Sequence, residues 1–357
     1  MKADDGERAQ RYSTLQMIAT ELGLDVSTVS RVLNSTPEGA RRAASKATAD
    51  KIRSLASDVG YSPNPHARSL RSRRSGEVGV LVPRVSDLVL ANIYEAIQTA
   101  SDALDVQSFV LSTYDDPARH NRALATLAKR RVDGVILGDA RLDEHDYDRP
   151  SLPAVAVSRR APSLTSITGD DEQGGRLAAE HLLSLGHAEV AVLAGQPYAS
   201  TGVDRTKGFV ERYREAGLEV PASRIVACGF DTHGGRTGVD RLGDALDGIT
   251  AIFAVNDFTA IGAIGALRQR GISVGEDFAL VGYNDVSLAA DLPVPLSTVR
   301  SPMADMGARA FDALMAVIGG EEFASEQLAP TLQARESTLE VARARPGAAR
   351  SMTTSLL

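Results

Sequence analysis

Residues 14–34, TLQMIATELGLDVSTVSRVLN, constrain the fold of this chain more than any other segment. Apolar residues recur at helical spacing before Gly23, and a glycine in a left-handed conformation commonly ends a helix. Asp25 can cap a second helix by accepting a hydrogen bond from the backbone amide of Ser27 or Thr28. Two short amphipathic helices joined in this way are predicted to form a helix-turn-helix.

The second of these helices divides into two faces. Val29, Val32 and Leu33 are predicted to point back at the first helix. The residues predicted to face outwards are Val26, Ser27, Ser30 and Arg31. Side chains near the start of such a helix reach base edges in the major groove, and arginine can bind guanine through two hydrogen bonds. We interpret the segment as a DNA reader; an ordinary helical hairpin inside a larger core is the alternative.

Charge is unevenly distributed along the chain. Residues 1–76 hold 13 Lys and Arg against 8 Asp and Glu, a net charge of +5, whereas the rest holds 26 against 38, a net charge of −12. A basic head on an acidic body suits phosphate binding at one end, with the body kept away from DNA by its own charge. We therefore expect double-stranded DNA as a partner of the N-terminal segment.

A basic segment with two prolines, YSPNPHARSLRSRR, follows at residues 61–74. Pro63 and Pro65 restrict the backbone before HARSL, which is long enough for one or two helical turns. Since so short a helix is marginal alone, its expected support is a twin helix from a second subunit together with DNA. Leu70 then acts as an apolar wedge that opens a base step in the minor groove. A solvated basic linker is the alternative, and composition by itself favours it.

The rest of the chain, about 280 residues, alternates between apolar strand-like runs and helical stretches. The predicted strands are Val78–Val82, Gln107–Leu111, Gly134–Leu137, Ala154–Val157, Val190–Ala194, Ile225–Ala227, Ala251–Val255 and Phe278–Gly282. Such repeats predict parallel sheets covered on both faces. A break near residues 168–170 divides the series into two halves, and Leu296–Val299 is predicted as a return crossing between them. The body is therefore expected to have two lobes, with a ligand cleft at the strand ends.

Polar and aromatic residues that directly follow apolar strands are candidates to line this cleft, because the strand fixes their position and the loop exposes them. These candidates are Arg84, Ser86, Asp87, Asp139, Ser158, Phe230, Asn256, Asp257, Asn284 and Asp285, together with Arg205, which is predicted to open a helix. Carboxylates, amides, arginine and an aromatic face together suit a polyhydroxylated ring, such as a sugar or a nucleoside. Helix capping or an ion pair within a loop is the alternative role for each.

Taken together, these segments resemble the LacI/GalR family of bacterial transcription regulators over nearly the whole chain, from Thr14 to Thr338. The motifs that carry the resemblance are TLQMIA, STVSRVLN, GYSPNPHARSL, VGVLVP, DGVIL, DEQGGRLAAEHLLSLGH, RTKGF, AVNDFTAIGAI, VGYNDV and LSTVRSPMADMG. Their order and spacing make the match specific. The resemblance implies a small all-α helix-turn-helix head and an α/β two-lobed core of the type I periplasmic-binding-protein kind, with parallel sheets.

The resemblance also assigns residues. It implies that Val26 and Ser27 read bases, that Arg31 also contacts DNA, and that the ligand is held by Arg205 and by Asn256 of the NDxxAxG segment. The full set of expected DNA-binding residues is Thr14, Leu15, Val26, Ser27, Thr28, Ser30, Arg31, Asn34, Tyr61, Asn64, Ala67 and Leu70. The expected ligand-binding residues are Asp87, Leu90, Asp139, Ser158, Arg205, Phe230, Asn256, Asp257 and Asn284.

The chain also departs from the family pattern. Residues 35–47, within STPEGARRAASKAT, are longer than the usual connection, and we expect an exposed loop extension there. In SDLVL, Asp87 stands where many members have asparagine, and Val89 and Leu90 stand where they have aromatics; Ser158 stands where aspartate is common. A different ligand from those of the better-known members is therefore expected.

The sequence contains few of the motifs that would indicate an enzyme. No segment reads GxxxxGK[ST], the glycine pairs do not make a dinucleotide fingerprint, and Cys228 is the only cysteine. We therefore predict no catalytic residue, no cofactor and no metal site. The first residues are polar and charged and no apolar run approaches a membrane span, so we expect a cytoplasmic protein without a membrane partner. A periplasmic sugar-binding protein and a sugar-modifying α/β enzyme remain as alternatives.

The prediction is thus a repressor that binds a palindromic operator as a homodimer and responds to a small polar effector, carbohydrate or nucleoside-like. The expected domains are a helix-turn-helix domain at 13–62, a hinge helix and linker at 63–76, a two-lobed ligand-binding and dimerisation domain at 77–340, and a disordered tail at 341–357.

Overall fold

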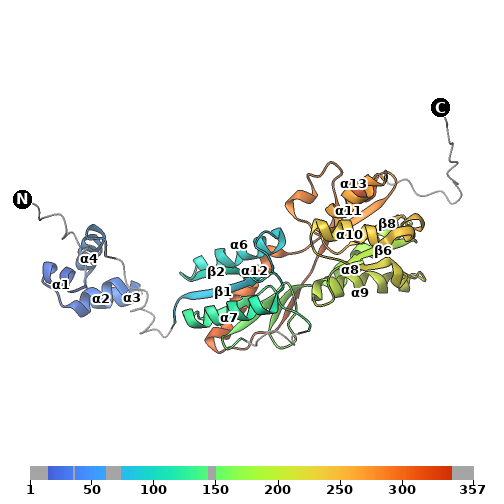
Figure 1. Cartoon of the computed structure of the whole chain (residues 1–357). Helices are drawn as coiled ribbons and strands as arrows, with labels where there is room; N and C mark the ends of the chain where they lie inside the picture. Colours follow the sequence, from blue (N-terminus) through green and yellow to red (C-terminus); the bar gives the residue numbers. More distant parts are fainter. Residues whose placement is uncertain (1–14, 35–36, 62–73, 144–149, 340–357) are drawn as a thin grey trace, which may run out of the picture. The chain divides into compact units, whose positions relative to one another are not determined.

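A computed structural model describes residues 15–34, 37–61, 74–143 and 150–339 of the chain. The chain divides into two compact units, Met1–Gly76 and Glu77–Leu357 (Figure 1). The predicted hinge helix and the C-terminal tail lie outside the described residues, apart from residues 74–76.

The first unit is a small helical head. Its helices are α1 Leu15–Leu22, α2 Val26–Asn34, α3 Pro37–Ala43 and α4 Lys46–Asp58. Gly23 ends α1 with a φ of +61°, and the Asp25 carboxylate accepts a hydrogen bond from the Ser27 amide at 2.7 Å. The predicted turn between the two helices is therefore confirmed, together with its cap. Three of the helices enclose one small apolar core, made by Ile18, Ala19, Val29, Val32, Ala49, Ile52 and Ala56.

The expected loop extension at residues 35–47 is wrong over 37–43, where the chain forms α3. Ala40 is buried, and Ala43 and Ala44 pack against the core of the head. Alanines at this i, i+3, i+4 spacing make one helical face, and alanine has the highest helix propensity. A short helix therefore replaces the expected loop, because it has an apolar face to bury.

The second unit contains two six-stranded sheets, each of which forms the centre of a lobe. The sheet of lobe 1 has the order β11-β5-β4-β3-β1-β2 and that of lobe 2 the order β12-β10-β9-β8-β6-β7. The strands of lobe 1 are β1 Glu77–Val82, β2 Gln107–Ser112, β3 Gly134–Leu137, β4 Ala154–Val157, β5 Ser166–Gly169 and β11 Glu326–Leu328. Those of lobe 2 are β6 Val190–Ala194, β7 Ile225–Ala227, β8 Ala251–Ala254, β9 Ala279–Asn284, β10 Ser297–Arg300 and β12 Thr331–Gln333.

Apart from β12, which runs antiparallel to β10, all the paired strands are parallel. In lobe 1, for example, Val80 of β1 lies opposite Val110 of β2 and Ile136 of β3. The helices between and after the strands are α6 Leu88–Asp102, α7 Pro117–Arg130, α8 Asp171–Ser184, α9 Ser200–Glu215, α10 Thr232–Leu242, α11 Asp257–Gln269, α12 Met303–Gly319 and α13 Glu336–Leu339. Short 3-10 helices lie at Ala222–Arg224, Gly243–Gly248 and Ser287–Ala289.

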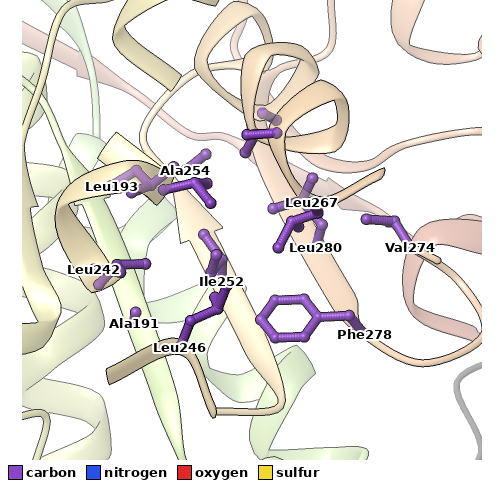
Figure 2. Close-up of a cluster of buried hydrophobic side chains, with 14 of the residues drawn as sticks. Ala191, Leu193, Leu242, Leu246, Ile252, Ala254, Leu267, Val274, Phe278 and Leu280 are labelled. Carbon is purple, nitrogen blue, oxygen red and sulfur yellow. The ribbon is translucent and has the colours of Figure 1, made fainter. Parts of the chain in front are cut away.

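Helices cover both faces of each sheet, as parallel sheets require. Side chains of α6 and α12 join one apolar cluster with lobe 1 strands, and α7 packs on the opposite face. In lobe 2, Ile252 of β8 faces α10 and α11, whereas its neighbour Phe253 faces α8 and α9. Figure 2 shows the first of these lobe 2 clusters, with Ile252 and Leu280 of the sheet beside Leu267 of α11.

The chain crosses between the lobes three times: between β5 and α8, between β10 and α12, and between β11 and β12. The first crossing lies at the predicted break near residues 168–170. The predicted return crossing at Leu296–Val299 is wrong, because residues 297–300 form β10 and pair with β9 inside the sheet of lobe 2. Val299 is fully buried there, and the chain leaves the lobe at Ser301 and Pro302 instead.

Two glycines allow α8 and α9 to approach closely in lobe 2. A Cβ atom on Gly175 would lie 2.1 Å from the Arg205 carbonyl oxygen, and one on Gly208 would lie 1.9 Å from the Glu172 carbonyl oxygen. Both distances are far shorter than any real contact to a Cβ atom, and backbone atoms cannot move aside easily. The close contact between α8 and α9 therefore requires glycine, which has no side chain, at both positions.

Replacing Gly208 by alanine is expected to lower the free energy of unfolding of the second unit by about 1–3 kcal/mol through overpacking. Urea unfolding followed by circular dichroism measures this change. Gly265→Ala in α11 is the matched control, because its Cβ would have its nearest neighbour at 3.7 Å. There, alanine is expected to leave stability unchanged or raise it by up to about 1 kcal/mol. Equal stability of the Gly208→Ala variant and the wild type would contradict the prediction.

Candidate functional site

A cavity of about 300 Å³ lies between the two lobes. Its walls come from the loops that follow strands of both sheets and from the first residues of α6, α9 and α11. The residues that line it are Pro83, Arg84, Ser86, Asp87, Val89, Leu90, Tyr114, Asp115, Ser158, Arg159, Gln196, Tyr198, Thr201, Arg205, Gly229, Phe230, Asp231, Asn256, Phe258 and Asn284. The volume is at the lower end of the range for small-molecule sites.

Most of the residues predicted to bind a ligand are brought together in this pocket. The ones that line it are Asp87, Leu90, Ser158, Arg205, Phe230, Asn256 and Asn284. Asp139 and Asp257 do not line it, and their side chains are fully buried beside it.

Arg205 does not open its helix, because α9 begins at Ser200; it lies in the second turn and is held rigidly in the pocket wall. Its Nε donates to the Asp171 carboxylate at 2.8 Å, and its Nη1 donates to the Val255 carbonyl oxygen at 2.7 Å. The guanidinium carbon lies 3.7 Å from the centre of the Tyr283 ring. Because Asp171 and Arg205 belong to α8 and α9, the close approach of these helices at the two glycines sets the position of this ion pair.

Asp87 and Asn256 cap helices as well as lining the pocket. Asp87 accepts a hydrogen bond from the Val89 amide at the start of α6, and burial raises the pKa of its carboxyl group. The Asn256 side chain accepts from the Thr259 amide at the start of α11 and donates to the Phe230 carbonyl oxygen at 2.8 Å. Each of these residues can therefore cap a helix and line the pocket, because it lies in the loop between a strand and the following helix.

Asp139 and Asp257 are buried behind the pocket wall, where their carboxylates hold neighbouring loops through hydrogen bonds. Asp139 accepts hydrogen bonds from Thr113 at 2.7 Å and pairs with His120 Nδ1 at 2.8 Å. Asp257 accepts from the Thr298 hydroxyl and the Val286 amide, and burial raises its pKa to about 7. A position after a strand does not reveal whether a side chain points into the cleft or beneath the next loop, so the sequence rule misplaced both.

Backbone strain is concentrated around the pocket. Tyr114, Asp115, Ser158 and Asn284 all have positive φ, from +55° to +104°. Such conformations are costly for residues other than glycine and persist only where the surrounding structure holds them. Within the described residues, the buried Oδ1 of Asn284 has no hydrogen-bond partner. Strain and an unsatisfied polar atom at the same wall are typical of a binding site.

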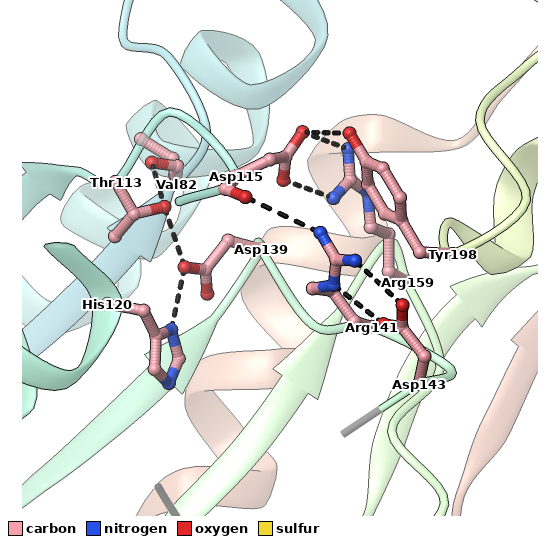
Figure 3. A network of polar contacts seen from close by, with 9 residues as sticks. All are labelled: Val82, Thr113, Asp115, His120, Asp139, Arg141, Asp143, Arg159 and Tyr198. Carbon is pink, nitrogen blue, oxygen red and sulfur yellow. Dashed lines mark hydrogen bonds and ion pairs between the residues drawn. The ribbon is translucent and has the colours of Figure 1, made fainter. Parts of the chain in front are cut away.

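Lobe 1 and lobe 2 meet at Tyr198, beside the pocket (Figure 3). The Tyr198 hydroxyl donates to the Asp115 carboxylate at 3.2 Å, and Arg159 pairs with the same carboxylate at 2.6 Å. The Arg141 guanidinium stacks 3.8 Å from the centre of the Tyr198 ring. Burial, and then the charge of Asp115, raise the pKa of Tyr198, so its hydroxyl remains a donor. We call these four residues the Tyr198 cluster.

Two further contacts between the lobes lie close to this cluster in the sequence. The Leu142 amide donates to the Tyr198 carbonyl oxygen at 2.9 Å, and Arg160 forms an ion pair with Asp204 at 2.8 Å. The Tyr198 cluster is therefore part of a polar seam that links the lobes at one side of the pocket.

Three members of the Tyr198 cluster line the pocket and were missed by the sequence analysis. Asp115 follows β2, Arg159 follows β4 and Tyr198 follows β6. The rule that selected Asp87 and Asn256 applies to these positions too, so the signal was present at every strand end.

Tyr198→Phe is expected to loosen the contact between the lobes, because it removes the hydrogen bond to Asp115 and keeps the ring. Spin labels on Asp102→Cys in lobe 1 and Arg214→Cys in lobe 2 would show a broader distance distribution. Tyr94→Phe is the matched control, since its hydroxyl donates to the Ser108 carbonyl oxygen inside lobe 1. Identical distributions for the two variants would refute a role of Tyr198 between the lobes.

In the head, α2 presents Ser27 and Arg31 to solvent, as predicted. Val26 was expected to face outwards, but it is half-buried and packs against the core of the head. It is the first residue of α2, and a helical side chain leans back over the preceding turn, which here belongs to the core. The exposed surface at the start of α2 is therefore polar.

The other predicted DNA contacts fall into two groups. Those that are half-buried in the head are Leu15, Thr28, Ser30, Asn34 and Tyr61. Those that lie outside the described residues are Thr14, Asn64, Ala67 and Leu70.

Comparison with known proteins agrees with this architecture. Residues 179–338 match a family described as periplasmic binding protein-like domain. The chain is 31% identical over 337 residues to the HTH-type transcriptional regulator DegA of Bacillus subtilis, which covers 91% of this chain and 98% of that protein. A structure of the lac repressor dimer bound to operator and an anti-inducer matches with a TM-score of 0.79 and 25% identity, over 92% of this chain and 100% of that one. The chain belongs to the LacI/GalR family.

This LacI/GalR protein is also 29% identical to the ribose operon repressor of Haemophilus influenzae, over 91% of this chain and 98% of that protein. Membership confirms the predicted family and fold class, and it makes the chain a DNA-binding transcription regulator rather than an enzyme. Among the described residues, no helix is long and apolar enough to cross a membrane. Within the same residues, no group of three or more His, Cys, Asp or Glu side chains could hold a metal ion.

Proposed function

We propose that this regulator is a repressor that binds a near-palindromic operator as a homodimer and senses a small polyhydroxylated metabolite, a sugar or a nucleoside. The observation that carries the proposal is the pocket between the lobes, where charged and amide groups converge with aromatic rings. Relatives with related named functions support it: one is a ribose operon repressor and another is a regulator in complex with cellobiose.

The pocket chemistry suits a ligand rich in hydroxyl groups. The Asp87 carboxylate accepts hydrogen bonds from hydroxyls, and a hydroxyl can both donate to and accept from Asn284. Phe230 offers an aromatic surface for the C–H face of a ring, and its own ring is fixed against Gly195, where a Cβ would lie 2.4 Å from it. The balance of arginines and aspartates in the wall favours a neutral ligand over a highly charged one.

Coupling between ligand and DNA requires that the ligand bind two arrangements of the lobes unequally. Asp87 belongs to lobe 1 and Phe230 to lobe 2, so a ligand that contacts both favours the arrangement that brings them together. The Tyr198 cluster holds the lobes beside the same pocket. We propose that ligand contacts and this cluster together set the equilibrium between the two arrangements of the lobes. A shift in this equilibrium would then change the operator affinity of the head.

The geometry of DNA reading supports the proposed homodimer. One helix-turn-helix reads only a few base pairs, whereas two heads related by a two-fold axis read a palindrome with useful specificity. Ser27 and Arg31 are the exposed residues of α2 that would reach base edges. In the wider comparison, the matched lac repressor structure is a dimer bound to its operator.

Selection of bound duplexes from a random pool tests the DNA side of the proposal. Purified protein at physiological salt is expected to enrich a palindrome with half-sites about one helical turn apart. The selection is repeated with a panel of sugars and nucleosides, so that a requirement for a co-repressor is detected. If no condition enriches a palindrome, the proposed homodimeric repressor is wrong.

Asp87→Asn tests the ligand side. Asparagine preserves the cap of α6 but removes the carboxylate, so affinity for the sugar or nucleoside that raises the melting temperature of the wild type is expected to fall at least about tenfold. Operator affinity without ligand is expected to stay unchanged. Asp116→Asn is the matched control, because Asp116 caps α7 in the same lobe and does not line the pocket. Equal ligand affinities for the two variants would exclude Asp87 from the site.

A further inference from the structure

The helix α3, which interrupts the expected loop after α2, presents two adjacent arginines. Arg41 and Arg42 are exposed at its end, and neither forms an ion pair with any described residue. Its other side is an alanine face, with Ala40 buried and Ala43 packed against the core of the head. The arginine pair is therefore carried on a structured element that is pinned to the head.

This element lies next to the helix that presents Ser27 and Arg31. Only residues 35 and 36 separate α2 from α3, and α3 contacts both α2 and α4. The unit that contains it has a net charge of +5, whereas the rest of the chain is acidic. An unpaired basic pair beside a DNA-reading helix complements the phosphate backbone of a duplex.

We propose that α3 is a second DNA contact, through which Arg41 and Arg42 bind backbone phosphates of the duplex read by α2. This inference rests on the proposed function and extends it. Successive residues of a helix point about 100° apart. Arg41 and Arg42 therefore reach two different phosphates and do not converge on one base, so the contact adds affinity and leaves sequence preference to α2.

A helix suits this task better than the expected loop. Ordering a flexible loop on DNA costs conformational entropy for every residue that becomes fixed. Because Ala40 and Ala43 already fix the backbone of α3, only the arginine side chains lose freedom on binding. A short insertion can thereby add phosphate contacts at low cost.

The test is the salt dependence of binding for the full chain with Arg41→Gln and Arg42→Gln together. Fluorescence anisotropy is measured with two labelled duplexes, one of random sequence and one that carries the selected operator. Loss of two phosphate contacts is expected to reduce the slope of log Kobs against log salt by about 1.8. From about 50 to about 200 mM salt, wild-type affinity should then fall about 12-fold more than that of the variant. The operator-to-random affinity ratio should not change.

Lys129→Gln with Arg130→Gln is the matched control. These residues are also an adjacent, exposed basic pair in the last turn of a helix, but they belong to α7 in the second unit. Their replacement lowers the net charge equally and is expected to leave the slope unchanged. If the slope fell equally for both double variants, the change would be an effect of net charge alone, and the proposal would be overturned.

Two other outcomes would also overturn it. An unchanged slope for the Arg41/Arg42 variant would show that no phosphate contact was lost. Weaker binding with the wild-type slope would mean that α3 only supports α2. Failure of the proposed function gives a different result, because the selection would then yield no operator, whereas the salt slopes of the wild type and the variant can still be compared on the random duplex.

Discussion

Parallel strands end at the same edge of their sheet, and the pocket of this protein depends on that constraint. The loops after β1, β2 and β4 of lobe 1 meet the loops after β6, β7 and β8 and the last residue of β9 in lobe 2, so polar residues far apart in the sequence line one cavity. Because buried strands and covering helices hold both ends of each loop, the loops can keep left-handed residues such as Tyr114 and Ser158. The apolar sheets therefore fix the positions of the loops, and the loops carry most of the polar side chains that line the pocket.

Much of this arrangement could be predicted from the sequence. The two helices around Gly23 have strong local patterns, and so do the strands β1, β2, β3, β4, β6, β7, β8 and β9; the matching elements are present. The strand β5 was missed, and so were the short edge strands β11 and β12, which lack the apolar run that identified the equally short β7. The segment that forms β10 was predicted to cross between the lobes. Its pairing with β9 depends on tertiary structure and cannot be recognised from the residues of β10 alone. The helix α3 was missed since its alanine face has little hydrophobic contrast.

The candidate site shows a different limit. Strand-end position was enough to find Asp87 and Asn256, and a family motif pointed to Arg205, but neither signal separated wall residues from supporting ones. Asp257 holds the loop through the Val286 amide, and the Val286 side chain packs in the apolar cluster of lobe 1. A residue expected to touch the ligand thus helps to join the lobes. Side-chain direction depends on the whole loop, which local sequence rules do not describe.

Neither lobe is made from one continuous stretch of chain. Lobe 1 takes α12 and β11 from beyond residue 300, and lobe 2 takes β12 and α13 from beyond residue 330. On a translating ribosome the helical head emerges whole and can fold early, whereas both sheets remain incomplete until almost the entire chain has been synthesised. The nascent chain therefore has a DNA-binding unit before it has a sensor, and truncated translation products would carry that unit without the pocket that controls it.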